Sequence, residues 1–164
     1  MPRVAKKPIK STMPKDVRVF LDSNVILSGL MSSKGSPRVL LDLLSLEAPH
    51  FKGLTGQYNI EEIERNLKDR FPELLPVWGN YFSKLKLEIV AIPPWDKVSP
   101  FTKKMSLKDA PVLVSAQLGN SDYLITGDKR GFPKEAAKPV LIVSPTDFLN
   151  KILPDLVIKW SEEV

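Results

Sequence analysis

Short apolar runs alternate with segments of helical periodicity along most of the chain. A short apolar or β-branched run bounded by turn residues is typical of a buried strand, and apolar residues three and four positions apart are typical of an amphipathic helix. We expect strands at residues 17–21, 51–54, 87–92, between Asp122 and Asp128, and at 140–143. Helices are expected at residues 23–31, 36–46, 58–68, 72–84, 108–118 and from 144 onward. This alternation predicts an α/β fold, a parallel sheet with helices on both faces.

The length is that of a single domain. The 164 residues suffice for one sizeable core, and 43% hydrophobic with 26% charged residues is typical of a globular protein. We expect a flexible basic arm at residues 1–16, one domain at 17–153 and a tail at 154–164. The arm suits either a solvated segment or a contact with RNA. The tail either packs on the domain or binds a partner.

Composition restricts the available chemistry. The sequence has no cysteine and one histidine, His50, which excludes disulfides, thiolate nucleophiles, zinc sites built on sulfur and sites with several histidines. Any metal ion must therefore be held by oxygen atoms. The net charge of +5 favours a polyanionic partner. No apolar run reaches the ~18 residues of a membrane span, and no secretion signal is evident, so we expect a cytoplasmic protein without membrane contact.

Four carboxylates stand where a strand ends or a helix begins. Asp22 and Asp128 each follow a short apolar strand, and Glu62 lies early in the helix after the second strand. In a parallel sheet, these positions share the edge at which ligands bind. Asp109 starts the helix that precedes a strand, so topology alone assures its position less well. Each acid also has a structural interpretation, as a helix cap or as a favourable charge near a helix start.

Converging carboxylates need a cation, because their mutual repulsion otherwise raises each pKa. Mg²⁺ and Mn²⁺ prefer oxygen ligands and suit an acidic cluster without histidine or cysteine. Such ions clamp a phosphate and lower the pKa of a bound water, so no histidine base is required. The resulting hypothesis is hydrolysis of phosphodiester bonds.

The ordered motifs resemble a known family. They read V-F-L-D-S-N-V-I-L-S-G-L at 19–30, I-E-E-I-E-R-N-L at 60–67, K-D-A-P-V-L-V-S-A at 108–116 and D-Y-L-I-T-G-D-K at 122–129. The resemblance covers residues 17–149 and is to PIN domains, especially prokaryotic toxin-like PIN proteins. It implies a three-layer α/β/α sandwich with a central parallel sheet, a Mg²⁺- or Mn²⁺-dependent ribonuclease, and often a homodimer neutralised by a cognate antitoxin.

The resemblance also assigns roles to individual residues. Asn24 and Thr126 match polar positions that support the metal ligands, and Ser23 stands where threonine is commoner in the family. Asp122, the residue before a strand, is expected to be a supporting or structural residue. The catalytic, metal-binding acids that the resemblance assigns are Asp22, Glu62, Asp109 and Asp128.

Three alternatives stay open. A different helix register would place Glu61 or Glu64 where we expect Glu62. A phosphatase of the haloacid-dehalogenase type would use Asp22 as nucleophile, but such enzymes usually have a second aspartate where this chain has Asn24. The third alternative is a PIN-like module that binds RNA or assembles with partners without catalysis.

Basic residues near the expected site are predicted to hold substrate phosphates with little base specificity. The aromatic residues Trp95 and Phe101 in the long connection at 93–106 suit either base stacking or packing under the loop. The predicted substrate-binding residues are Lys103, Lys104, Lys129 and Arg130.

Overall fold

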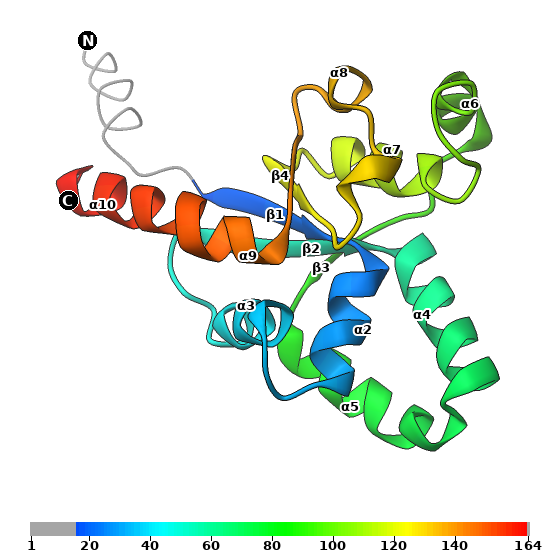
Figure 1. Ribbon diagram of the computed structural model, residues 1–164, viewed down its shortest axis with the longest axis horizontal. Helices are drawn as coiled ribbons and strands as arrows, with labels where there is room; N and C mark the ends of the chain where they lie inside the picture. Colours follow the sequence, from blue (N-terminus) through cyan, green and yellow to red (C-terminus); the bar gives the residue numbers. More distant parts are fainter. Residues whose placement is uncertain (1–15, 164) are drawn as a thin grey trace, which may run out of the picture.

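Five short parallel strands form one sheet. The computed structural model describes residues 16–163. The strands lie in the order β3-β2-β1-β4-β5, and every neighbouring pair is parallel (Figure 1). The predicted parallel sheet is therefore confirmed, with β1 at its centre. The strands are β1 (Val17–Leu21), β2 (Phe51–Gly56), β3 (Glu88–Val90), β4 (Tyr123–Ile125) and β5 (Leu141–Val143).

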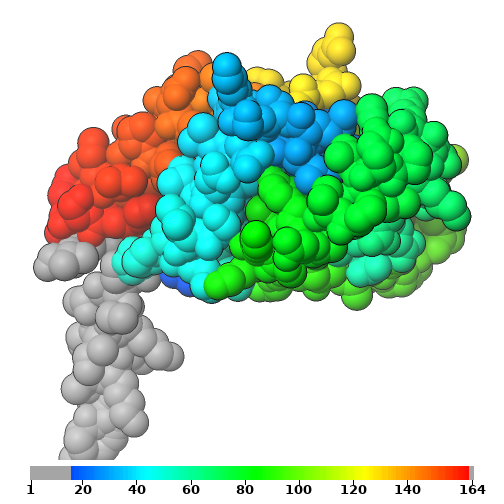
Figure 2. Space-filling model, turned by 90° about the horizontal axis from the view of Figure 1, so that it is seen from below, coloured from blue at the N-terminus to red at the C-terminus, as the bar shows by residue number. Residues whose placement is uncertain are grey.

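Helices cover both faces of this sheet, which confirms the predicted α/β/α sandwich (Figure 1). One face carries α2 (Ser23–Met31), α3 (Ser36–Ser45), α4 (Gln57–Arg70), α5 (Leu75–Leu85), α9 (Pro145–Asp147) and α10 (Leu153–Glu163). The other carries α6 (Trp95–Val98), α7 (Ala110–Leu118) and α8 (Lys134–Ala137). The helix α10 lies at one end of the molecule, and α4 lies at the other (Figure 1 and Figure 2).

Residues of β1 alternate between two hydrophobic cores. The fully buried Val19 and Leu21 pack with α2 and α3, whereas the equally buried Phe20 packs with α7 on the other face. This alternation follows from the two-residue period of a strand. It fixes β1 firmly between the layers, so Asp22, the next residue, is held at the carboxyl edge of the sheet.

Two segments differ from the prediction. The connection at 93–106 was expected to be irregular but contains α6 and a 3₁₀ turn at Ser99–Phe101. Within it Phe101 packs against the core cluster of Val98, Ala110 and Val114, whereas the side chain of Trp95 is 63% exposed. The stretch at 72–84 divides into the 3₁₀ turn Pro72–Leu74 and α5.

The structure describes nearly all of the predicted C-terminal tail but only one residue of the predicted N-terminal arm. The basic arm predicted at residues 1–16 lies outside the described residues except for Asp16. The predicted tail is helical: a π-helical segment, Phe148–Ile152, leads into α10, which packs through Leu156 against the core. Across residues 16–163, the structure contains no helix whose length and apolar character would let it span a bilayer.

Candidate active site

A pocket of about 340 Å³ lies where β1 and β4 end. Its walls come from the β1–α2 junction, from α4, from the residues before α7 and from the turn after β4. The structure therefore brings the four predicted carboxylates together, including Asp109, whose arrival topology left less assured. The polar and charged residues around the pocket include Asp22, Glu62, Asn66, Lys108, Asp109 and Asp128.

Asp22 is the buried member of this group, with 7% of its surface exposed. Its Oδ1 accepts hydrogen bonds from the Ser23 amide at 2.7 Å and from Asn59 Nδ2 at 3.3 Å, and its Oδ2 accepts one from the Thr126 hydroxyl at 2.9 Å. Asp22 is thus also the N-cap of α2, as its structural interpretation required. The cap orients the carboxylate without removing it from the pocket.

Burial raises the pKa of Asp22 to about 6. Hydrogen bonds from Thr126 and the Ser23 amide lower this pKa, and the neighbouring carboxylates of Glu62 and Asp109 raise it. None of the ion pairs among the described residues includes Asp22. A buried carboxylate with hydrogen bonds but no cationic partner is suited to bind a cation from solution.

Thr126 connects the acids that follow β1 and β4. Its hydroxyl donates to Asp22 and accepts from the backbone amide of Asp128 at 3.1 Å and from Asn24 Nδ2 at 3.4 Å. Asn24 Oδ1 in turn accepts from the Gly127 amide at 3.0 Å. Both predicted supporting residues therefore hold the turn after β4 against the start of α2. The side chain of Asn24 is an amide engaged in these hydrogen bonds, so this position supplies no second acid for a phosphatase mechanism.

Ser23 and Asn59 orient Glu62. The Ser23 hydroxyl donates to Glu62 Oε1 at 2.6 Å, and Asn59 Nδ2 lies 2.9 Å from Ser23 Oγ. The alternatives in α4 have other partners: Glu61 pairs with Gln57, and Glu64 accepts from the Trp78 ring nitrogen. The helix register is therefore the one expected, with Glu62 facing the pocket.

Asp109 is the N-cap of α7, but its side chain makes no capping hydrogen bond. It lies instead against Gly131: a Cβ added to that glycine would come within 2.5 Å of Asp109 Oδ2. The absence of a side chain at Gly131 thus leaves room for this carboxylate beside the turn that carries Asp128.

Two of the four acids have basic neighbours. Lys108 Nζ lies 3.5 Å from Glu62 Oε2, and Arg130 Nε lies 3.3 Å from Asp128 Oδ1. In the described part of the chain, no three acidic, histidine or cysteine side chains are arranged closely enough to form a ready metal site. The carboxylates share a pocket, and ligation by several of them at once would require side-chain rotation.

The donor set nevertheless fits a hard divalent cation. The pocket offers carboxylate and amide oxygens and no histidine or sulfur, the ligand type of Mg²⁺ and Mn²⁺. The side chains of Lys108 and Arg130 are 76% and 94% exposed, so both can move away from the acids into solvent at little cost. Asp22, already oriented and lacking a cationic partner, would provide the fixed ligand.

Three polar lining or supporting residues escaped the sequence analysis: Asn59, Asn66 and Lys108. Asn59 and Asn66 lie three residues before and four residues after Glu62, so helical spacing alone places them on the same face. Asn59 also lies beside the buried stripe of Ile60 and Ile63, where an unpaired polar side chain is unusual. Its place beside this apolar stripe could have identified Asn59 from the sequence.

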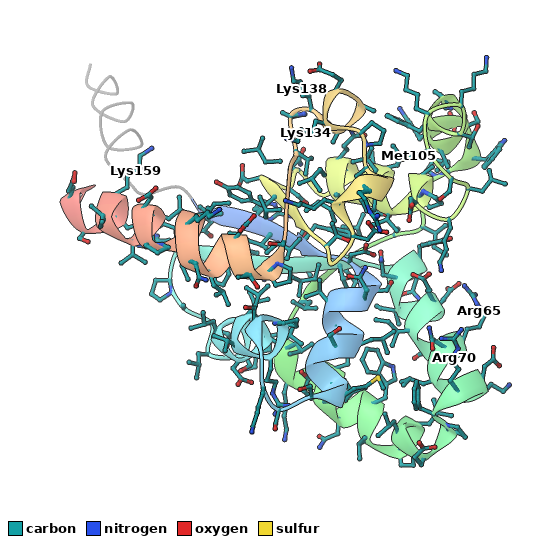
Figure 3. The ribbon with its side chains drawn as sticks, in the orientation of Figure 1. Arg65, Arg70, Met105, Lys134, Lys138 and Lys159 are labelled. Carbon is teal, nitrogen blue, oxygen red and sulfur yellow. The ribbon has the colours of Figure 1, made fainter. Side chains whose placement is uncertain are left out.

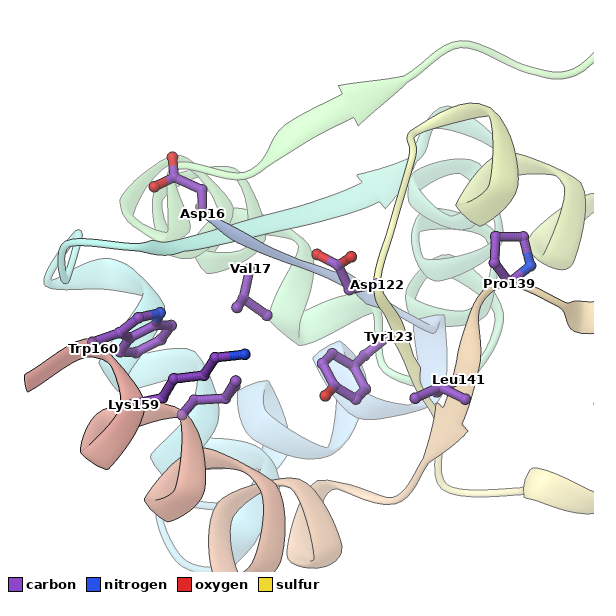
Figure 4. A pocket seen from close by; sticks show the side chains of 9 residues that line it. Asp16, Val17, Asp122, Tyr123, Pro139, Leu141, Lys159 and Trp160 are labelled. Carbon is purple, nitrogen blue, oxygen red and sulfur yellow. The ribbon is translucent and has the colours of Figure 1, made fainter. Parts of the chain in front are cut away.

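The sequence left two roles open for Asp122. It lies at the start of β4, and its Oδ2 accepts from the Arg18 amide at 2.8 Å, so it extends the β1–β4 ladder. It lines a different pocket, also of about 340 Å³, at the amino ends of the strands (Figure 4). Of the two predicted alternatives for Asp122, support of the acids and a structural role, the structure favours the structural one, because the strand β4 separates Asp122 from Asp128.

The predicted substrate cations are distributed unevenly. Lys129 and Arg130 directly follow Asp128, where Lys129 pairs with Asp147 at 3.7 Å and Arg130 with Asp128. Lys103 and Lys104 are exposed in the turn between α6 and α7 and do not line the acidic pocket. The cation that does line it is Lys108.

The fold and site together define a class: an α/β/α sandwich with four carboxylates around one pocket at the carboxyl edge of a parallel sheet. Residues 18–130 match the family described as PIN domain. The chain belongs to the PIN domain family, and the resemblance seen in its motifs is confirmed.

Solved structures share the fold. One is the crystal structure of VapBC2 from Rickettsia felis bound to a DNA fragment from their promoter, with 14% identity, a TM-score of 0.54, and coverage of 77% of this chain and 97% of that chain. Another is DNA-bound VapBC from Salmonella typhimurium, with 14% identity, a TM-score of 0.60, and coverage of 79% and 98%. No curated protein matches the chain significantly.

Proposed function

We propose that this PIN domain protein is a Mg²⁺- or Mn²⁺-dependent endoribonuclease. The observation that carries the proposal is the pocket in which Asp22, Glu62, Asp109 and Asp128 meet. Four acids from distant parts of the sequence repel one another around one pocket: burial is the main reason that the pKa of Asp22 is raised, and Glu62 and Asp109 raise it further. Such an arrangement is typical of a site whose function requires a cation.

In this proposal Asp22, Asp109 and Asp128 bind the ion, and Glu62 completes the site. When bound, a divalent ion supplies a water of lowered pKa and polarises the scissile phosphate. The chain contributes orientation: Thr126 and the Ser23 amide fix the Asp22 carboxylate, and Ser23 fixes that of Glu62. The loss of a supporting hydrogen bond of this kind commonly lowers metal affinity or activity about 10–100-fold.

In this proposal Lys108 exchanges its contact with Glu62 for a contact with the substrate. Its ammonium group lies beside Glu62 on a side chain that is 76% exposed. When the acids bind a divalent ion, Lys108 is released from Glu62 and can contact a substrate phosphate. Lys129 and Arg130, next to Asp128, remain proposed phosphate contacts of the same kind.

We further propose that the protein is the toxin of a toxin–antitoxin pair, a homodimer that acts on RNA in the cytoplasm. The two similar complexes are described as VapBC proteins bound to DNA, which supports a search for a partner protein. Light scattering of the purified chain tests the dimer. Co-expression with the product of an adjacent reading frame, followed by co-purification and an RNA cleavage assay, tests the antitoxin.

Incubation of the purified chain with a mixed RNA pool tests the activity. Parallel reactions contain Mn²⁺, Mg²⁺ or chelator, and the cut ends are mapped. We expect cleavage with either ion, none with chelator and none by Asp128→Asn, whereas Asp155→Asn, an exposed change in α10, retains activity. RNA binding without cleavage under every condition would favour the non-catalytic module instead, and cleavage by Asp128→Asn at the wild-type rate would refute the site.

A further inference from the structure

A second cavity continues the acidic pocket along α4. Its volume is about 300 Å³, and it shares Glu62, Asn66 and Lys108 with that pocket. The remaining walls are formed by Tyr58, Arg65, Asp69 and Arg70. We call this cavity the α4 groove. Because the shared residues line both spaces, a ligand in the acidic pocket can extend into the α4 groove.

The α4 groove provides positive charge beside the acids. Arg65 and Arg70 are exposed and project from α4 (Figure 3). Neither takes part in an ion pair among the described residues. Both guanidinium groups are therefore available to an anionic ligand, for which their planar donors are well suited.

The positions of these side chains follow from helical spacing. Tyr58, Glu62, Asn66 and Arg70 are each four residues apart and so form one stripe of α4, with Arg65 beside it. At 1.5 Å per residue the stripe is ~18 Å long. Another face of α4, formed by Ile60, Ile63 and Leu67, is buried and holds the helix in place. Arg65 and Arg70 thus lie along α4 beyond Glu62, and Asp69 lines the same groove beside them.

We propose that the α4 groove binds the single-stranded segment of RNA next to the scissile phosphate. Arg65 and Arg70 contact its phosphates, and the half-buried Tyr58 ring, which packs against the core, stacks on a base. A single strand is favoured over a duplex because Asp22, at 7% exposure, must be reached by a phosphate that enters the pocket. This inference rests on the proposed ribonuclease function and replaces Lys103 and Lys104 as the main path of the strand.

The test compares Arg65→Ala/Arg70→Ala with Lys134→Ala/Lys138→Ala. The second variant removes the same charge from exposed lysines at the start and at the C-cap of α8, away from α4 (Figure 3). Cleavage is measured on a labelled 12-nucleotide oligoribonucleotide and on a dinucleotide, and binding of the longer RNA is measured by fluorescence anisotropy over a range of salt concentrations. Circular dichroism melting establishes that both variants are folded.

For the arginine variant we expect kcat/KM on the 12-mer to fall at least ten-fold, mainly through KM. Activity on the dinucleotide, which is too short to occupy the α4 groove, should stay within two-fold. Two lost phosphate contacts should reduce the slope of log affinity against log salt by about 1.4, at about 0.7 per contact on a single strand. The lysine variant should match the wild type in all three measurements.

Tyr58 supplies an independent arm of the experiment. Tyr58→Phe keeps the ring and should bind the 12-mer like wild type, whereas Tyr58→Leu should bind it about ten-fold more weakly, since base stacking is lost. Equal binding by both variants and the wild type would remove Tyr58 from the proposal.

The outcomes separate this inference from the proposed function. Cleavage by the wild type with no loss in the arginine variant, or with equal losses on both substrates, overturns the α4 groove and leaves the nuclease. Binding that depends on the arginines without cleavage by the wild type supports the groove and overturns the nuclease. If the wild type neither binds nor cleaves RNA, both proposals fail.

Discussion

The two ends of β4 carry pockets of about equal volume, and both contain aspartates, yet they differ in how these acids are used. At the amino end, the Asp122 carboxylate accepts from the Arg18 amide and thereby extends the sheet. At the carboxyl end, Asp22 and Asp128 are held by hydroxyl and amide groups that orient them toward a shared space. The comparison indicates that strand direction and hydrogen-bond partners determine which acids can meet in a shared site, and that presence beside a pocket is not enough.

The largest expected difference between the two ends is in activity. Asp22→Asn should lower RNA cleavage at least about 100-fold, because a metal contributes several kcal/mol of transition-state stabilisation and 1.36 kcal/mol is ten-fold in rate. Asp122→Asn retains an oxygen that can accept from the Arg18 amide and should stay within about two-fold. Initial rates at saturating Mn²⁺ measure both, and equal losses in the two variants would remove the distinction.

Stability in the presence of chelator should depend on pH through Asp22. Its pKa is about 6 in the folded protein and 3.8 ordinarily, so the carboxyl is protonated in both states below pH 3.8, where its contribution to stability is fully present. Between pH 3.8 and about 6 the unfolded chain ionises while the folded protein keeps its proton, so the folded protein loses up to about 3 kcal/mol of stability, and the loss is complete above about pH 6.

Urea unfolding of wild type and Asp22→Asn between pH 4 and pH 8 measures this loss, because other groups cancel in the difference between the two proteins. The variant should gain stability relative to wild type as the pH rises. A difference that does not change with pH would contradict the burial of an ionisable Asp22.

The hydroxyl groups at the two ends of β4 offer a finer comparison. Thr126→Val removes the donor to Asp22 Oδ2 and the acceptor for the Asp128 amide, so activity should fall about 10–100-fold. Thr126→Ser should restore most of it. Ser121 is also buried, but its hydroxyl has no hydrogen-bond partner, and Ser121→Ala should leave cleavage unchanged. The three rates, measured at equal Mn²⁺, test whether Thr126 acts by positioning the acids.

Glycines give the smallest expected effect. Gly131→Ala would place a Cβ within 2.5 Å of Asp109 Oδ2 and should displace that carboxylate, which lowers activity about ten-fold with little change in stability. Gly119→Ala would place a Cβ 2.9 Å from Val90 Cγ2 and should cost about 1–3 kcal/mol of stability with activity per folded molecule unchanged. Thermal melting and initial rates distinguish the two patterns.

The sequence was sufficient to predict a feature of the site where the residue type and its position in the chain allow one structural outcome. The apolar run before Asp22 required a buried strand, and the direction of that strand placed Asp22 at the carboxyl edge. The same reasoning located Asp128 and Glu62. For Asp122 it left a supporting and a structural role open. Because the residue before a strand lies at the opposite edge of the sheet, strand direction favours the structural role.

Other parts of the site depend on contacts across layers. Nothing in the sequence around Gly131 indicates that Asp109 lies against it, since the two belong to different elements and meet only after folding. In the sequence, Lys108 and Arg65 are ordinary exposed cations, and the roles proposed for them depend on the groove between α4 and the start of α7. Long, exposed side chains have no periodic signature, so the cations were the least predictable part of the site.

Anomalous scattering from crystals soaked in Mn²⁺ tests the central claim most directly. The account predicts a peak in the pocket lined by Asp22, Asp109 and Asp128, which is lost in Asp22→Asn crystals, and no peak beside Asp122 at the other end of β4. The absence of manganese from the first pocket at saturating concentration would contradict it.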